Sequence, residues 1–173
     1  MAEKEKHIKT LFLLRHAKAE AHDLRKNDHE RRLIDKGIRH AEKMAKLVDA
    51  FRFKPQAIVT SSAARAKETA AIFADTLGLK QKLTVNDVLY SASQQVYLQT
   101  VQQLPDDLDN VMIVGHNPVL EDLLVSLSSR SPFHCKMPTC GLAAVHCHVT
   151  LWSEIRPATG IMRVLLYPKL FAE

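Results

Sequence analysis

Arg15 and His16 are the residue pair in this chain most suited to chemistry, because they directly follow the apolar run LFLL at positions 11–14. An apolar run flanked by charge is typical of a strand that is buried on both faces. In an open α/β sheet, ligands bind at the carboxyl ends of the strands. An arginine there can bind an anion through paired N–H donors, and a neighbouring histidine can act as a nucleophile near neutral pH. The pair alone does not exclude a solvated loop.

Two later segments have the same character. The sequence SSAAR, ending at Arg65, follows an expected strand at 57–60, and GHNP, which contains His116, follows another at 111–114. If these strands are parallel, all three polar segments open on one edge of the sheet. Two of the segments also begin helices, whose free N–H groups favour anions. Together they predict a phosphate site, and the absence of a glycine-rich Walker loop argues against a nucleotide-binding loop of that type.

The elements that must position these residues follow from the hydrophobic pattern. We expect strands at about 8–14, 57–60, 83–88 and 111–114, helices at about 36–51, 62–77, 94–104 and 118–127, and a C-terminal hairpin from 142–152 and 161–167. The expected helix N-caps are Asp35, Ser61 or Ser62, and Asn117. This order predicts a single α/β domain over residues 1–173, with three α/β/α layers, a mostly parallel central sheet and an antiparallel C-terminal hairpin.

Composition narrows the class of protein. The chain has 173 residues, of which 46% are hydrophobic and 25% are charged, as in soluble globular proteins. No apolar run approaches the roughly 20 residues that a membrane-spanning helix needs, and the start, MAEKEKHIK, lacks the apolar core of a secretory signal. An odd number of cysteines favours reduced thiols. We therefore expect a cytoplasmic protein, a monomer, with no membrane partner.

The charge is unevenly distributed. Residues 1–82 carry 19 lysines and arginines against 11 acidic residues, a net of +8, whereas residues 83–173 carry 5 against 8, a net of −3. A basic half can bind nucleic acid or attract anionic substrates into a cleft. Because aromatic residues make up only 6% of the chain and no nucleic-acid motif occurs, we expect no nucleic-acid partner.

The sequences RHAKAE at 15–20, SSAARAKETA at 61–70 and VGHNP at 114–118 resemble the histidine phosphatase superfamily, which has the phosphoglycerate mutase-like fold. The short length is most similar to its SixA branch, the phosphohistidine phosphatases. The similarity extends through DHERRLIDKG at 28–37 and MPTCGLAAV at 137–145.

The resemblance implies roles for particular residues. It makes His16 the nucleophile that accepts the phosphoryl group, with Arg15 and Arg65 binding phosphate and His116 as the second histidine of the pocket. It also places Arg31 and Thr139 at the substrate rim. It implies no metal and no other cofactor.

Two departures from the family pattern matter. Ala17 stands where the superfamily usually has glycine, and no glutamate follows the third expected strand, where larger relatives place a general acid. Glu20, Asp23 or Glu30 could replace that acid. A missing acid favours phosphohistidine as substrate, because its nitrogen leaving group is labile, whereas an alkoxide leaves badly without a proton.

Cysteines and histidines near the end of the chain raise the alternative of a zinc site; they are Cys135, Cys140, His146, Cys147 and His148. Side chains alternate along a strand, so Cys147 should face away from the two histidines. Four ligands must converge on a structural zinc ion. We therefore expect no metal site here.

The sequence thus predicts a metal-independent phosphatase that works through a phosphohistidine intermediate, on phosphohistidine in a protein. Three alternatives stay open: a phosphatase of small phosphoesters, a catalytically weak module that binds phosphorylated proteins, and a basic nucleic-acid-binding domain. Mutase activity is disfavoured, because a short chain lacks the insertions that would enclose a sugar phosphate.

Overall fold

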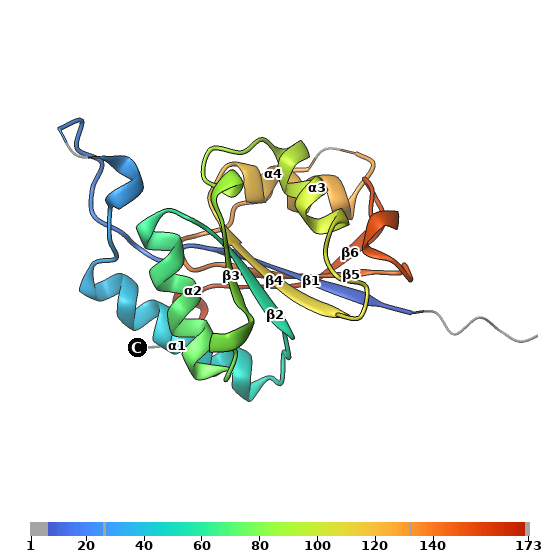
Figure 1. The fold of residues 1–173 in the computed structure, drawn as a ribbon, viewed down its shortest axis with the longest axis horizontal. Coiled ribbons are helices and arrows are strands. Elements are labelled where there is room, and N and C mark those ends of the chain that lie inside the picture. The colour runs from blue at the N-terminus through green and yellow to red at the C-terminus, as the bar shows by residue number, and fades with distance from the viewer. Residues whose placement is uncertain (1–6, 26, 132, 172–173) are drawn as a thin grey trace, which may run out of the picture.

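The computed structural model describes residues 7–25, 27–131 and 133–171 and contains one six-stranded sheet (Figure 1). The order of the strands across the sheet is β3-β2-β4-β1-β5-β6. The strands are β1 (Lys9–Arg15), β2 (Ala57–Ser61), β3 (Leu83–Asn86), β4 (Asn110–Gly115), β5 (Leu142–Cys147) and β6 (Gly160–Leu166). The helices are α1 (Asp35–Ala50), α2 (Ala64–Thr76), α3 (Gln94–Gln102) and α4 (Val119–Ser128).

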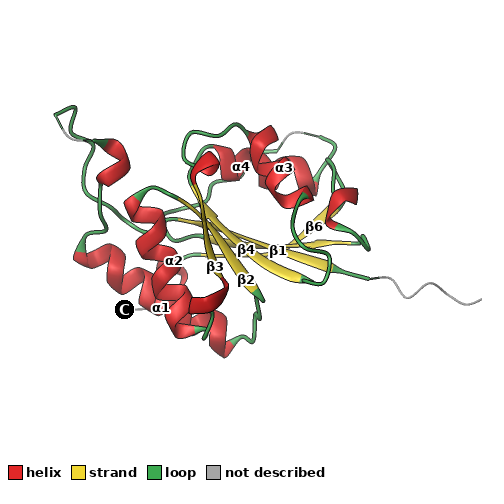
Figure 2. Cartoon of the chain, viewed as in Figure 1, coloured by secondary structure: helices red, strands yellow, loops and turns green. Residues whose placement is uncertain are grey.

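The sheet is parallel over its first four strands and antiparallel at its end. β1 pairs with β4, and β2 pairs with both β3 and β4, all in parallel, whereas β5 is antiparallel to β1 and to β6. Helices lie on both sides of these strands (Figure 2). The predicted α/β fold, mostly parallel with an antiparallel C-terminal hairpin, is confirmed.

β1 lies inside the sheet and contributes to the core on both faces, as its continuous apolar run predicts. Leu11 and Leu13 pack into the cluster that includes residues of α3 and α4, and Phe12 and Leu14 pack into the cluster formed with α1 and α2. These four side chains are at most 3% exposed. Because these central positions are apolar on both faces, the polar residues of β1 lie at its two ends, with Arg15 at the carboxyl end.

Two of the predicted helix starts are displaced by a residue. Asp35 is the first residue of α1, whose N-cap is Ile34, and Pro118 rather than Asn117 is the N-cap of α4. The Asn117 side chain instead donates to the Glu121 carboxylate at 2.6 Å and to a backbone carbonyl. It therefore joins α4 to the loop before β5 rather than capping the helix.

The predicted serine N-cap of α2 is also wrong, because the cap residue is Ala63 and has no side-chain capping bond. The hydroxyls of Ser61 and Ser62 are engaged elsewhere: each lies within 2.9 Å of a histidine ring nitrogen, of His116 and His29 respectively. Both serines face the candidate site described below.

The first strand of the C-terminal hairpin is shorter than predicted, whereas the second has the predicted length. β5 ends at Cys147, and Trp152 lies in a short 3₁₀ turn, fully buried, with its indole N–H donating to the Leu108 carbonyl at 2.8 Å. β3 likewise ends at Asn86, whose side chain accepts from the Val88 N–H and caps a following turn. In the three described ranges, no helix has the length and apolar character needed to cross a bilayer.

Candidate active site

Because β1, β2 and β4 are parallel, the three polar segments predicted from the sequence lie at one edge of the sheet. Arg15 is the register partner of Gly115, and the His16 N–H donates to the Gly115 carbonyl at 3.0 Å. This pairing places the ring centroids of His16 and His116 5.2 Å apart. The prediction that these strand ends meet is confirmed.

His16 is held with one ring nitrogen engaged by the backbone. Its Nδ1 lies 2.8 Å from the Ala17 carbonyl oxygen, and its Nε2 accepts from the Arg65 Nε–H at 3.3 Å. Both contacts suit the neutral tautomer that carries its proton on Nδ1. Burial, together with the nearby charges of His116 and Arg65, lowers the pKa of His16 to about 3. The lone pair on Nε2 is therefore present at neutral pH.

Arg65 comes from the first turn of α2 and is almost fully buried. Its Nη1 donates to the Asp28 carbonyl at 2.7 Å and its Nη2 to the Asp28 carboxylate at 3.0 Å. These two bonds hold one side of the guanidinium and direct Nε toward His16. The arginine is thus fixed against the histidine before any substrate arrives.

Asp28 was not singled out from the sequence, although it lies within the similar segment 28–37. It begins the 3₁₀ turn η1 (Asp28–Glu30), and its carboxylate also accepts from Arg31 Nε at 2.8 Å and from the Tyr90 hydroxyl at 2.9 Å. Burial raises the pKa of this carboxyl, but the hydrogen bonds from Tyr90 and Arg65 lower it by more, to about 2. Asp28 is therefore ionised at neutral pH.

His116 lies on the other side of His16 and is 8% exposed. Its Nε2 is 2.8 Å from Ser61 Oγ, and its Nδ1 is buried without a hydrogen-bond partner among the described residues. Burial and the neighbouring Arg65 lower its pKa to about 4.

Arg15 also has a buried nitrogen without a hydrogen-bond partner. Its Nη1 donates to the Met137 carbonyl at 2.8 Å, while its Nε is buried and unpartnered within the described ranges.

The two residues predicted at the substrate rim, Arg31 and Thr139, lie in different parts of the structure. Arg31 joins the site through Asp28 and also donates to the Glu20 carbonyl at 2.6 Å. Thr139 lies half-buried in the loop before β5. That loop contacts the segment that carries His16, because the Cys140 N–H donates to the His16 carbonyl at 3.1 Å and the Arg15 N–H to the Gly141 carbonyl at 2.9 Å.

The three acids suggested as proton donors form contacts away from His16. The Glu20 carboxylate accepts from the Arg32 N–H, and the Asp23 carboxylate accepts from Arg25. Glu30 is exposed on η1. Their described hydrogen bonds place none of them against the histidines.

Ala17, which replaces the usual glycine, fits without backbone strain. It is fully buried, its N–H donates to Thr69 Oγ1 at 3.0 Å, and it is not among the described residues with positive φ. The methyl group therefore does not force the loop after His16 into an unfavourable conformation.

The cysteines and histidines considered as a zinc site near the end of the chain do not converge on a common point. Cys147 is buried in the core cluster on the α3–α4 face, whereas His146 lines a hollow on the other side with Arg163 and Phe53. Across the described ranges, no three side chains among His, Cys, Asp and Glu are arranged to hold a metal ion.

Comparison with known proteins places this site in context. Residues 11–89 match the family model described as the histidine phosphatase superfamily (branch 1). An uncharacterized chloroplastic protein of Arabidopsis thaliana is 29% identical over 160 residues, 87% of this chain and 72% of that protein.

Among solved structures, a SixA protein from Agrobacterium tumefaciens, named as a candidate phosphohistidine phosphatase, superposes with a TM-score of 0.76 at 28% identity. The superposed region covers 92% of this chain and 98% of the Agrobacterium protein. The protein histidine phosphatase SixA complexed with tungstate superposes with a TM-score of 0.80 at 19% identity, over 93% of this chain and 98% of its own. The fold predicted from the sequence is therefore shared with SixA structures over nearly the whole chain.

Proposed function

We propose that this chain, a member of the histidine phosphatase superfamily with the fold of the SixA branch, removes the phosphoryl group from phosphohistidine in a protein and passes it through His16 to water. The observation that carries this proposal is the neutral Nε2 of His16, fixed within 3.3 Å of the Arg65 guanidinium. A nucleophile and a cation that binds phosphate oxygens are thereby placed side by side.

In the first step, the lone pair of His16 Nε2 forms a bond to phosphorus while the N–P bond of the substrate breaks. The bonding electrons return to the substrate ring, which leaves as neutral imidazole because its other nitrogen carries a proton in the reacting form. In the second step, water attacks phosphorus, the bond to His16 breaks, and inorganic phosphate is released. The Nδ1 contact with the Ala17 carbonyl stabilises the charge that His16 carries between the two steps.

Charge on the transferring group is balanced by donors that the protein already holds in place. Arg15, Arg65 and His116 surround His16, and a phosphoryl oxygen would supply a partner for the buried Arg15 Nε and His116 Nδ1. Preorganised donors of this kind stabilise the equatorial oxygens of the transferring phosphoryl group. We propose that the two arginine cations, with His116 as a neutral donor, make a metal ion unnecessary.

Because the Asp28 carboxylate is ionised at neutral pH, the site favours a substrate whose leaving group departs without being protonated. Asp28 accepts bonds from Arg65, Arg31 and Tyr90, and its pKa of about 2 makes it a poor proton donor at neutral pH. An alkoxide leaving group needs such a donor, whereas an imidazole leaves more readily. Phosphohistidine is therefore favoured over alcohol and sugar phosphates, with small phosphoesters as weaker substrates.

The test measures phosphate release from a phosphohistidine protein and from p-nitrophenyl phosphate, both in the presence of EDTA. The wild type is compared with His16→Ala and with a control, His146→Ala, whose ring lies outside the site. We expect release by the wild type and the control, loss of release in His16→Ala, and unchanged circular dichroism in all three. Retained turnover in His16→Ala would refute the assignment of the nucleophile.

The same experiment separates the other candidate functions. Release from p-nitrophenyl phosphate alone would indicate a small-phosphoester phosphatase. No release from either, with vanadate still bound, would indicate a module that binds phosphorylated proteins without hydrolysing them. A cytoplasmic, monomeric protein that binds neither nucleic acid nor membrane stays our expectation.

A further inference from the structure

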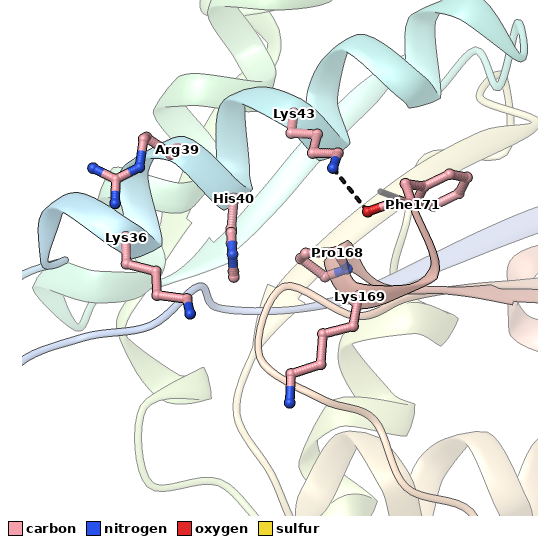
Figure 3. Close-up of a pocket in the computed structure, with 7 residues that line it drawn as sticks. All are labelled: Lys36, Arg39, His40, Lys43, Pro168, Lys169 and Phe171. Atoms are coloured by element: carbon pink, nitrogen blue, oxygen red, sulfur yellow. Dashed lines mark hydrogen bonds between the residues drawn. The ribbon is translucent and has the colours of Figure 1, made fainter. Parts of the chain in front are cut away.

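A basic groove lies between α1 and the C-terminal segment, outside the site of His16. It has a volume of about 850 Å³ and is lined by Lys36, Arg39, His40, Lys43, Pro168, Lys169 and Phe171 (Figure 3). Five of these seven side chains are basic and none is acidic. Such a concentration of one charge creates a positive potential that attracts anionic partners.

The groove follows from the spacing of residues on α1. Lys36, Arg39, His40 and Lys43 occupy positions i, i+3, i+4 and i+7, which lie on one face of a helix. The opposite wall is the turn η5 (Pro168–Leu170) and Phe171, and Lys43 Nζ donates to the Phe171 carbonyl at 2.9 Å (Figure 3). This bond joins the two walls at one end.

One end of the groove lies near the edge of the sheet that carries the candidate active site. β6 ends where β5 begins, at the register pair Leu166 and Leu142, and Leu142 is paired in turn with Leu14 of β1. Pro168 follows two residues after β6. On the other wall, Gly37 packs so closely on the Lys18 backbone that a Cβ would lie 2.0 Å from its carbonyl oxygen. Both walls therefore begin beside the nucleophile segment.

We propose that this groove docks an acidic segment of the phosphohistidine protein, so that the phosphorylated histidine reaches His16. The proposal rests on the proposed function, because it assigns the protein substrate its second point of contact. Opposite charges at a docking site speed the encounter and select the partner, while the donors around His16 act on the phosphoryl group itself.

The shape of the groove favours a polypeptide over a single small anion. The seven residue steps from Lys36 to Lys43 along the helix rise about 10 Å, the length of about three residues of extended chain. One phosphate would contact only part of this row. Pro168 adds an apolar surface to the opposite wall, which suits side chains of a peptide.

Single-stranded nucleic acid fits less well. Sequence-tolerant binding of single strands uses aromatic rings on which bases stack. The aromatic residue here, Phe171, is half-buried and its ring packs against Phe51, with centroids 6.4 Å apart. An acidic protein segment is the partner that the charges and the apolar wall both fit.

The test compares a double charge reversal in the groove, Lys36→Glu with Lys169→Glu, with a matched control, Lys46→Glu with Lys82→Glu. All four lysines are exposed, and the control pair lies on α1 and before β3, outside the groove. The substrates are an acidic histidine phosphotransfer domain and a basic histone, each phosphorylated on histidine, and p-nitrophenyl phosphate. A fluorescein-labelled oligoglutamate peptide measures binding directly by anisotropy.

For the groove variant, we expect kcat/KM on the acidic protein to fall about tenfold relative to the control, mainly through KM, with release from the histone and from p-nitrophenyl phosphate unchanged. Peptide affinity should fall by a similar factor and should weaken with added salt. Equal kcat/KM and equal peptide binding in the two variants would overturn the proposal.

Two further results would also overturn it. Displacement of the peptide by millimolar inorganic phosphate in the wild type would make the groove a site for small anions, and tighter, groove-dependent binding of single-stranded RNA would make it a nucleic-acid site. Failure of the wild type on every phosphohistidine substrate would instead refute the proposed function, and the peptide titration would still decide whether the groove binds acidic chains.

Discussion

The Asp28 carboxylate and backbone carbonyl both bind the Arg65 guanidinium, at 3.0 and 2.7 Å, and leave only the Nε of that arginine directed at His16. One residue, Asp28, thus fixes the orientation of the cation beside the proposed nucleophile. The carboxylate carries a negative charge next to the proposed phosphate site, and this charge would repel an anionic substrate if it were not neutralised. Arg31 and Arg65 both pair with it, and this pairing leaves the site cationic.

Asp28→Ala should lower kcat/KM about tenfold on both phosphohistidine protein and p-nitrophenyl phosphate, because Arg65 loses its anchor. Asp28→Asn should lower kcat/KM by less, since the amide oxygen can still accept a hydrogen bond from Tyr90 or Arg65. Steady-state kinetics beside Asp23→Ala, a change at a carboxylate outside the site, measures this. If Asp28→Asn abolished release from an alkyl phosphate but spared p-nitrophenyl phosphate, whose nitrophenolate leaves without a proton, Asp28 would be the proton donor rather than a positioning residue.

Arg65→Lys should reduce turnover about a hundredfold, because one ammonium cannot both hold Asp28 and present a planar donor to the phosphoryl oxygens. Arg65→Ala should also weaken the binding of vanadate. The two measurements are single-turnover kinetics and inhibition by vanadate, with Arg25→Lys as a conservative change outside the site. Full turnover in Arg65→Lys would show that only the positive charge matters.

The stability of the protein should decrease as the pH falls below 6.5. The folded-state pKa values of His16 and His116 are about 3 and about 4, below the 6.5 of an unfolded histidine. Between these values the unfolded chain binds more protons, so stability is full above pH 6.5 and is lost toward acid, by up to about 1.4 kcal/mol per pH unit for each histidine.

Urea unfolding without phosphate checks this in the wild type and in His16→Asn, which cannot titrate there. The wild type should lose about 1–2 kcal/mol more than the variant between about pH 6.5 and about pH 5. Equal losses would mean that His16 titrates normally in the folded protein.

The sequence predicted the parts of the site that depend on local pattern. Each of Arg15, Arg65 and His116 follows a short apolar strand within five residues, and parallel pairing then brings the strand ends together. The mostly parallel sheet and the antiparallel C-terminal hairpin follow from the same pattern, whereas the order of the strands across the sheet was not predicted. These predictions needed no information about contacts between distant residues.

The sequence did not predict the contacts that hold the site rigid. Asp28 and Tyr90 are 62 positions apart, and nothing near either residue indicates that they share a hydrogen bond. The serine N-caps failed for a related reason. Ser61 and Ser62 have the residue type of a cap, but their hydroxyls bind His116 and His29 in the folded chain.

Gly37→Ala should destabilise the protein and lower turnover together. The added methyl group would lie 2.0 Å from the Lys18 carbonyl oxygen, so either α1 or the loop that carries His16 must move. Overpacking of this kind costs about 1–3 kcal/mol, and a small displacement of the nucleophile reduces catalysis further. Thermal unfolding and kcat on p-nitrophenyl phosphate measure the two effects, beside Lys46→Ala on the exposed face of α1, which should change neither. Unfolding at the wild-type temperature with unchanged kcat would show that this contact relaxes without moving His16.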